Sequence, residues 1–65
     1  MQLVNRIKEI RKLAKMRQKD LAELSAISQP FLCDLENNRR GAKPETLNRI
    51  AGALGVDVAL LIKED

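Results

Sequence analysis

The side chains of this sequence that could do chemistry are mostly basic, and they gather in two stretches of the chain. Seven lysines and arginines fall between residues 6 and 19, where Glu9 is the only acidic residue. A second basic group follows later in the chain: Arg39, Arg40 and Lys43. The net charge is +3, and this uneven distribution favours an anionic partner, with nucleic acid first among the candidates. The charge alone fits equally well with lysines and arginines that only solvate helix surfaces.

Enzymatic and metal chemistry find little support in the sequence. The chain has no histidine and a single cysteine, Cys33, so neither an internal disulfide nor a zinc site of the usual kind is expected. It also lacks a glycine-rich phosphate loop and a spaced pair of nucleophile and base. We therefore expect no enzymatic activity, no metal and no cofactor. Because no run of about eighteen apolar residues and no signal peptide is present, we expect a cytoplasmic protein with no membrane partner.

The length of 65 residues suits one domain, spanning residues 1–65, with a thin hydrophobic core. Such a core rarely supplies more than about 3–5 kcal/mol of net stability. A second copy or a ligand would therefore add appreciably to the stability of the folded state. The apolar residues are mostly Leu, Ile, Ala and Val, which favours packed helices with short connections.

The spacing of apolar residues by three and four predicts a series of amphipathic helices. The first helix ends near residue 16 and has this apolar stripe: Leu3, Val4, Ile7, Ile10, Leu13 and Ala14. The second helix covers about residues 18–25. The third follows Ser28, whose hydroxyl can cap its first turn, has Pro30 in that turn and ends near Asn37.

The remaining sequence predicts two further helices. A loop rich in Asn and Gly, residues 37–41, separates the third helix from the fourth. Pro44 opens the fourth helix, and Gly55, just past Leu54, has the place of its C-terminal cap. Asp57 can cap a last short helix with these apolar residues: Val58, Leu60, Leu61 and Ile62.

The most informative segment runs from Gln18 to Asn37, where two short helices are separated by about three residues. Helices joined so closely cannot pack parallel and must cross steeply. Ala22 is small where the helices would cross, and Ile27 can fill the angle between them. Three leucines would form the shared core: Leu21, Leu32 and Leu35. The outer face of the second of these helices, starting at Gln29, then forms a rigid ridge that suits the DNA major groove, which is about 12 Å wide.

Residues 16–56 resemble the helix-turn-helix domain shared by lambda-type phage repressors and the Xre family of bacterial regulators. The resemblance rests on the joint spacing of these residues: Gln18, Leu21, Ala22, Ile27, Ser28, Leu32, Leu35, Glu36, Asn37 and the run PETLNRIAGALGV from Pro44. It implies an all-α fold, a compact lambda-repressor-like bundle of five helices in which the second and third form the helix-turn-helix. It also implies a bacterial or phage-encoded transcriptional regulator, a repressor that binds a palindromic operator on double-stranded DNA as a homodimer.

The resemblance further implies which residues face DNA: Arg17, Gln18, Lys19, Ser28, Gln29, Pro30, Phe31, Asp34, Arg39 and Arg40. Both glutamines would bond a phosphate or an adenine edge, and Asp34 would accept from a cytosine amino group. Pro30 offers an apolar contact to a thymine methyl group. Phe31 would pack either on a sugar-phosphate edge or in the core. The arginines and Lys19 would bind phosphates.

Three positions carry structural expectations that also follow from the resemblance. Arg11 and Glu36 match an ion pair that ties the first helix to the end of the third, and its role would be register more than net stability. Ala26 stands at the turn position that glycine usually holds, where a left-handed backbone costs alanine about 1 kcal/mol. Arg17 stands where the cap of the second helix would be, and its side chain cannot accept a backbone hydrogen bond.

The last helix is expected to serve dimerisation, because Val58 and Leu61 match positions of dimer contacts in the resembled family. A two-fold dimer would place two reading helices roughly 34 Å apart, one turn of DNA. One alternative is a monomer cut from a longer regulator whose missing portion dimerises. Another is a protein-interaction module or an antitoxin-type protein that uses the apolar residues of the last helix to bind a partner protein.

Overall fold

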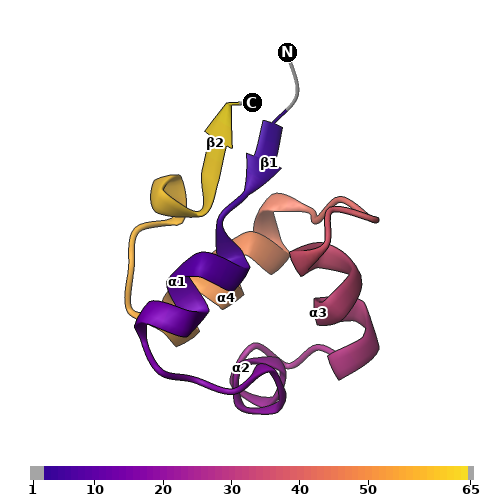
Figure 1. The fold of residues 1–65 in the computed structure, drawn as a ribbon, viewed down its shortest axis with the longest axis vertical. Helices are drawn as coiled ribbons and strands as arrows, with labels where there is room; N and C mark the ends of the chain where they lie inside the picture. The colour runs from indigo at the N-terminus through magenta and orange to yellow at the C-terminus, as the bar shows by residue number, and fades with distance from the viewer. Residues whose placement is uncertain (1–2, 65) are drawn as a thin grey trace.

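The computed structural model describes residues 3–64, so residues 1, 2 and 65 of the expected domain lie outside the described residues. Within that range the chain forms these elements (Figure 1): β1 (Leu3–Asn5), α1 (Ile7–Leu13), α2 (Gln18–Leu24), α3 (Gln29–Glu36), α4 (Pro44–Leu54), a 3₁₀ helix η1 (Val58–Leu61) and β2 (Ile62–Glu64). The helices surround a common centre, and the two strands pair beside them.

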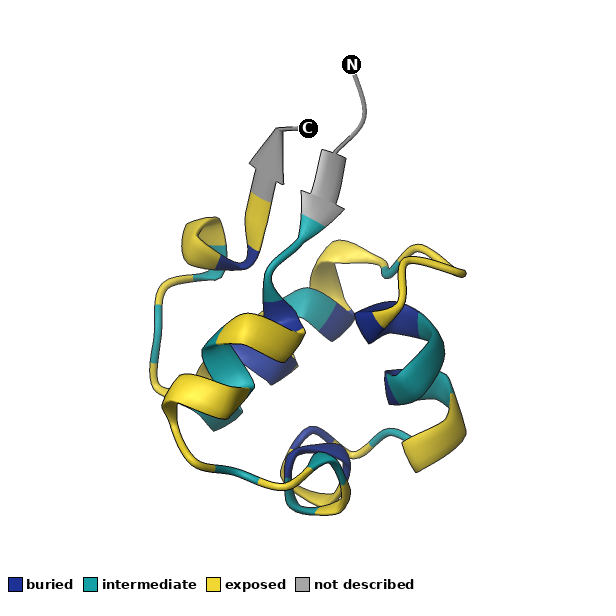
Figure 2. Cartoon of the chain, viewed as in Figure 1, coloured by how far each residue is buried: buried dark blue, intermediate teal, exposed yellow. Residues whose placement is uncertain are grey.

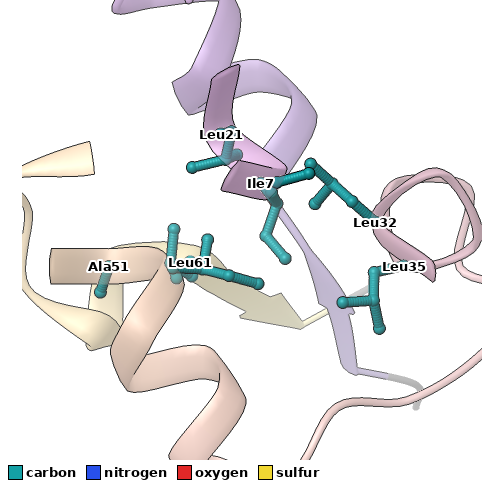
Figure 3. Close-up of a cluster of buried hydrophobic side chains, with 8 residues drawn as sticks. Ile7, Leu21, Leu32, Leu35, Ala51 and Leu61 are labelled. Atoms are coloured by element: carbon teal, nitrogen blue, oxygen red, sulfur yellow. The ribbon is translucent and has the colours of Figure 1, made fainter. Parts of the chain in front are cut away.

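Every helix contributes to a single hydrophobic core, whose eight side chains are at most 4% exposed and therefore exclude water: Ile7, Leu21, Ala22, Leu32, Leu35, Ile50, Ala51 and Leu61. Figure 3 shows side chains from α1, α2 and α3 pointing toward one another at its centre. The three leucines expected between α2 and α3 are all in this cluster, which confirms the sequence prediction of a shared core. Burying each such side chain stabilises the folded state by about 1.5–3 kcal/mol before the loss of chain entropy.

The expected helix boundaries are largely confirmed, and capping residues lie at the expected helix ends. Ser28 precedes α3, and its Oγ accepts a hydrogen bond from the Phe31 backbone N–H at 3.2 Å. Pro44 is the first residue of α4, and Gly55 ends that helix in the left-handed conformation at φ 72°. Asp57 accepts from the Ala59 backbone N–H at 2.9 Å at the start of η1.

The expectation of a purely helical chain is corrected at its two ends. Leu3 and Val4, expected at the start of the first helix, lie in β1, and Ile62, expected in the last helix, lies in β2. The strands are antiparallel, and Asn5 pairs with Ile62 at their inner end. Strands of three residues are too short to show an alternating pattern in the sequence. Their apolar residues therefore cannot be distinguished from the apolar stripes of the neighbouring helices.

The expectation of five α-helices is also corrected, since the described residues form four, followed by one turn of 3₁₀ helix. A 3₁₀ helix has three residues per turn, so residues three apart lie on the same side. Val58 and Leu61 therefore share the inward side of η1, where Leu61 is fully buried and Val58 packs against the core.

Each of the four α-helices is followed within two residues by a residue with a left-handed backbone: Lys15 (φ 55°), Ala26 (φ 58°), Asn38 (φ 57°) and Gly55 (φ 72°). After α2 the Ala26 N–H bonds the Glu23 carbonyl at 3.2 Å, and the Ile27 N–H bonds the Ala22 carbonyl at 3.0 Å. This pair of backbone hydrogen bonds satisfies the last carbonyl groups of the helix. Glycine occupies only the fourth of these positions, so the other three helix ends carry some backbone strain.

Candidate nucleic-acid interface

The corner between α2 and α3 is built from residues 25–28. Ala26 takes the left-handed conformation that turns the chain, which is the geometry expected for the position that glycine usually holds. Ile27 is half-buried and packs against the core inside the corner. Gln29 and Pro30 then open α3 at the surface, as the exposed start of that helix in Figure 2 shows.

A buried ion pair holds the end of α3 against α1. The Arg11 Nε lies 2.7 Å from the Glu36 Oε2, and the Arg11 Nη2 donates to Oε1 at 3.2 Å, so the pair is bidentate. The Glu36 side chain is 2% exposed, so its charge depends on this partner. The Arg11 Nη1 also donates to the Met16 carbonyl at 2.9 Å, which fixes the turn between α1 and α2.

Two glutamines extend this ion pair to the surface. Gln18 donates its Nε2 to Glu36 Oε1 at 3.1 Å, and Gln29 donates its Nε2 to Gln18 Oε1 at 3.3 Å. Because an ionised carboxylate only accepts hydrogen bonds, Glu36 determines which end of the Gln18 amide faces it. The Gln18 oxygen is therefore directed to Gln29, whose own amide oxygen and second N–H remain for another partner.

Arg39 and Arg40 follow α3, and their side chains contact residues of that helix. Arg39 Nη1 lies 3.8 Å from Asp34 Oδ1, and the Arg40 guanidinium carbon lies 5.3 Å from the centre of the Phe31 ring. The first is an exposed ion pair and the second a cation–π contact, and each restricts an otherwise free cation. Phe31 is half-buried and packs against the core with part of its surface, so the core expectation for this ring is met in part, and its contact with a sugar-phosphate edge stays a prediction.

At the start of α2 the basic residues are exposed, and one of them is already paired. Arg17 donates its Nε to Asp20 Oδ2 at 2.9 Å, and this hydrogen bond with the positive charge beside it lowers the pKa of Asp20 below its usual range. As expected, Arg17 makes no side-chain cap of α2. Lys19 is exposed next to it.

The structure therefore places five of the ten expected DNA-facing residues in two groups. Arg17, Gln18 and Lys19 begin α2 beside the start of α3, and the arginines 39 and 40 lie beyond its end. Ser28 has its hydroxyl committed to the cap of α3. Behind the second group lies an open cleft of about 510 Å³, lined in part by Asn5 and Asn38, which the sequence analysis did not single out.

The expected dimer contacts need a correction. Leu61 is fully buried within the single chain, so its side chain is not available to a second copy. The resemblance implied a dimer contact at this position, but in this chain the one turn of 3₁₀ helix directs the Leu61 side chain into the core. The exposed apolar residues in this region are instead Leu60 at 47% and Ile62 at 38%, so more than a third of each is accessible to a partner.

The described residues offer neither a membrane-spanning helix nor a metal site. No helix in that part of the chain is long and apolar enough to cross a membrane. No group of three or more cysteine, aspartate and glutamate side chains there is placed to hold a metal ion.

Similarity to other proteins agrees with this architecture. A curated immunity repressor protein of Bacillus phage phi105 is 42% identical over 60 residues, which cover 92% of this chain and 42% of the phage protein. The HTH-type transcriptional regulator DdrOP3 of Deinococcus deserti is 38% identical over 63 residues, which cover 97% of this chain and 49% of that regulator. The chain thus spans less than half the length of these two relatives, and neither is named as an enzyme.

Solved structures show the same fold. A Bacteroides fragilis protein assigned to DNA binding superposes with a TM-score of 0.90 at 26% identity, over 95% of this chain and 100% of that one. The clp gene regulator ClgR from C. glutamicum gives a TM-score of 0.79 at 32% identity, over 82% of this chain and 69% of that one. The family model described as helix-turn-helix matches residues 7–61. This confirms the resemblance drawn from the sequence, and the chain belongs to the lambda-repressor-like, Xre-type helix-turn-helix family.

Proposed function

We propose that this domain regulates transcription by binding double-stranded DNA at a specific sequence, with α3 in the major groove. The observation that carries the proposal is the chain of hydrogen bonds from Glu36 through Gln18 to Gln29. It anchors an exposed amide at the start of α3 to a buried ion pair, so that the amide meets a base edge in one fixed orientation. An amide is suited to adenine, which presents one donor and one acceptor in the major groove.

The other expected residues take roles that fit their positions. Gln18, half-buried beside Gln29, would bond a phosphate, and Pro30 would contact a thymine methyl group. Asp34 would accept from a cytosine amino group, although Arg39 lies only 3.8 Å from its carboxylate. Phe31 would present the edge of its ring to the sugar-phosphate backbone.

Basic side chains on both sides of α3 would bind the DNA strands. Arg17 and Lys19 lie beside its start, and Arg39 and Arg40 follow its end, so the two groups can reach phosphates flanking the groove. Such contacts fix the position of the protein on DNA and carry no base preference of their own. Phosphate binding by Arg17 requires it to leave Asp20.

We further propose that the domain acts as a homodimer and represses at a palindromic operator. The exposed Leu60 and Ile62 are the main candidates for the dimer contact, whereas Val58, half-buried and packed against the core, offers a partner only its remaining exposed surface. The support is that these apolar side chains gather at the C-terminal end of the described chain, where burial by a second copy would remove them from water. The same repressive role is in the name of the phage relative.

Selection of bound sites from a random DNA pool tests the proposal most directly. We expect a palindromic motif whose half-sites lie about one turn, roughly 34 Å, apart. With about 6–10 phosphates neutralised, affinity for that site should fall about 10³–10⁵-fold between 50 and 200 mM salt. Enrichment of no sequence, together with a flat salt response, would refute sequence-specific binding.

Two variants separate the proposed roles on the selected duplex. Gln29→Ala should relax the preference at one base position, whereas Arg40→Ala should weaken binding to all sequences alike. The reverse pattern would exchange the roles assigned to the two residues.

A second candidate function is recognition of a partner protein. Two leucines at the ends of α1 and α2 support it, because Leu13 is 73% exposed and Leu24 is 63% exposed. Failure of the domain to shift any DNA at low salt, together with a partner lost on Leu24→Glu substitution, would favour this function over DNA binding.

A further inference from the structure

An asparagine at the end of β1 is bonded to the far end of the reading helix. The Asn5 Nδ2 donates to the Leu35 carbonyl and, at 3.0 Å, to the Asn38 Oδ1, while the Asn5 backbone N–H reaches the same Oδ1 at 3.3 Å. The Asn5 Oδ1 accepts from the Ile7 N–H at 3.1 Å. One side chain thus joins the strand pair, the start of α1 and the end of α3.

The bonds converge where the chain leaves α3. Asn38 has a left-handed backbone at φ 57°, and its N–H bonds the Leu35 carbonyl at 3.1 Å. The Arg39 N–H then bonds the Asp34 carbonyl at 2.9 Å. The direction in which Arg39 and Arg40 leave the helix is therefore set at Asn38.

The loop that carries these arginines has few other supports. Residues 37–41 are all exposed, and Figure 2 shows this loop standing at the surface. The described side-chain contacts of the two arginines are the ion pair of Arg39 at 3.8 Å and the ring contact of Arg40 at 5.3 Å, and both are weak at an exposed site. Asn5 is half-buried, so its hydrogen bonds are better shielded from water than those contacts.

We propose that Asn5 is a positioning residue for the DNA contact: it clamps Asn38 and thereby holds Arg39 and Arg40 where they meet the phosphates. This inference rests on the proposed DNA-binding function and adds a residue to it. Asn5 touches no DNA itself and reads no base. Its loss should weaken binding to all sequences equally, because the free protein would then have to order two arginine side chains on binding.

Two variants break the clamp from opposite sides, and Asn5→Asp also removes the hydrogen bond from the Asn5 Nδ2 to the Leu35 carbonyl. Asn5→Asp keeps the oxygen that accepts from the Ile7 N–H but loses the Nδ2 donor. Asn38→Gly loses the Oδ1 acceptor, while glycine readily adopts a φ near +57°, so the helix end is preserved. Asn37→Ala is the matched control, because the Asn37 Nδ2 donates only to groups of Cys33 in the same helix.

Affinity is measured for a random-sequence duplex and for the selected duplex across a salt series. We expect Asn5→Asp and Asn38→Gly each to weaken both duplexes by about tenfold and to lower the salt slope by about 0.9 for each phosphate that the arginines no longer neutralise. The double variant should be weaker by much less than the two single effects multiplied, since both single variants remove the bond between the Asn5 Nδ2 and the Asn38 Oδ1. Hydrogen exchange of the Arg39 amide should speed up in both, and Asn37→Ala should change neither measurement.

Wild-type affinity and salt slope in both clamp variants, with Asn37→Ala equally unchanged, would overturn the clamp and leave the proposed function standing. Absence of wild-type binding to any duplex at low salt would overturn the proposed function and this inference with it. An altered base preference in Asn5→Asp would also overturn it, because a clamp on phosphate contacts leaves base reading intact.

Discussion

Helix α3 is preceded and followed by turns that accommodate a left-handed residue in different ways. The turn before α3 and the loop after it each contain a left-handed residue that is not glycine, Ala26 at φ 58° and Asn38 at φ 57°. Ala26 has no side-chain group to offset its strain. Asparagine tolerates the left-handed conformation better than alanine, and the Asn38 Oδ1 accepts a hydrogen bond from the Asn5 Nδ2.

The surroundings of the two turns differ in kind as well. The entry turn is held by packing, with Ile27 half-buried and the Ser25 side chain fully buried. The exit loop is exposed and is held by polar contacts. The angle of α3 relative to α2 therefore depends on packing in the core, whereas the position of Arg39 and Arg40 depends on a few hydrogen bonds.

The strongest test of this contrast is to remove core packing beneath the entry turn. Leu32→Ala should destabilise the domain by about 2–5 kcal/mol, because Leu32 is fully buried in the core. That loss is comparable to the whole net stability expected for a core of this size, about 3–5 kcal/mol. Circular dichroism during urea titration should show a largely unfolded variant. Leu24→Ala, at a 63% exposed leucine of α2, is the control and should change stability by less than about 0.5 kcal/mol.

The two serines that flank the entry turn should respond to alanine with opposite signs. The Ser25 Oγ is buried and has no hydrogen-bond partner among the described residues, so Ser25→Ala should stabilise the domain by about 1–2 kcal/mol. Ser28→Ala removes the cap of α3 and should destabilise it by about 1 kcal/mol. Thermal melts of the two variants compare these effects. Destabilisation by Ser25→Ala would mean that the hydroxyl has a partner after all, such as a bound water molecule.

Glycine substitution compares the two left-handed residues directly. Ala26→Gly should stabilise the domain by about 1 kcal/mol, because it relieves the strain of a left-handed alanine. Asn38→Gly should gain less, since asparagine already tolerates that backbone and the substitution removes its bonds to Asn5. The difference between the two gains in the free energy of unfolding, from denaturant titration, measures the lower strain of asparagine together with the bonds to Asn5. Equal gains at both positions would remove the contrast between the turns.

The sequence predicted the parts of this molecule that local chemistry determines. Ser28, Pro44 and Gly55 mark helix ends because each residue type meets a need of the backbone next to it, and the structure confirms these boundaries. The leucines between α2 and α3 could be placed because an apolar period of 3.6 residues directs them to one side. Such signals lie within a few residues of the feature that they predict.

The parts that the sequence did not predict depend on contacts between distant segments or on a choice between similar local structures. The pairing of Asn5 with Ile62, and the bonds from Asn5 to Asn38, join segments that share no local pattern. The burial of Leu61 follows from a 3₁₀ period that four apolar residues in a row cannot distinguish from an α-helical one. Sequence reasoning therefore placed the corner between α2 and α3, and it missed the contacts that the two strands make with the end of α3.

The smallest expected effect concerns the ion pair of Arg17 with Asp20 at the start of α2. Arg17 lowers the pKa of Asp20, chiefly through their hydrogen bond, so the folded protein binds a proton there less readily than the unfolded chain does. The pair therefore stabilises the fold above the unfolded pKa of about 3.9, and that contribution is lost as the pH falls through the lower folded pKa. Carboxyl NMR should give an Asp20 midpoint below its ordinary value of 3.8, and Arg17→Ala should raise that midpoint.

Arg6→Ala is the matched control, because Arg6 bonds Glu9 in the same spacing at the start of α1 and should leave the Asp20 midpoint unchanged. A bound duplex distinguishes a structural pair from one that DNA opens. If Arg17 leaves Asp20 for a phosphate, the Asp20 midpoint should rise on DNA binding, as it does in Arg17→Ala. A midpoint that stays low in the complex would show that Arg17 remains with Asp20, and the phosphate contacts at the entry side would then fall to Lys19 and Gln18.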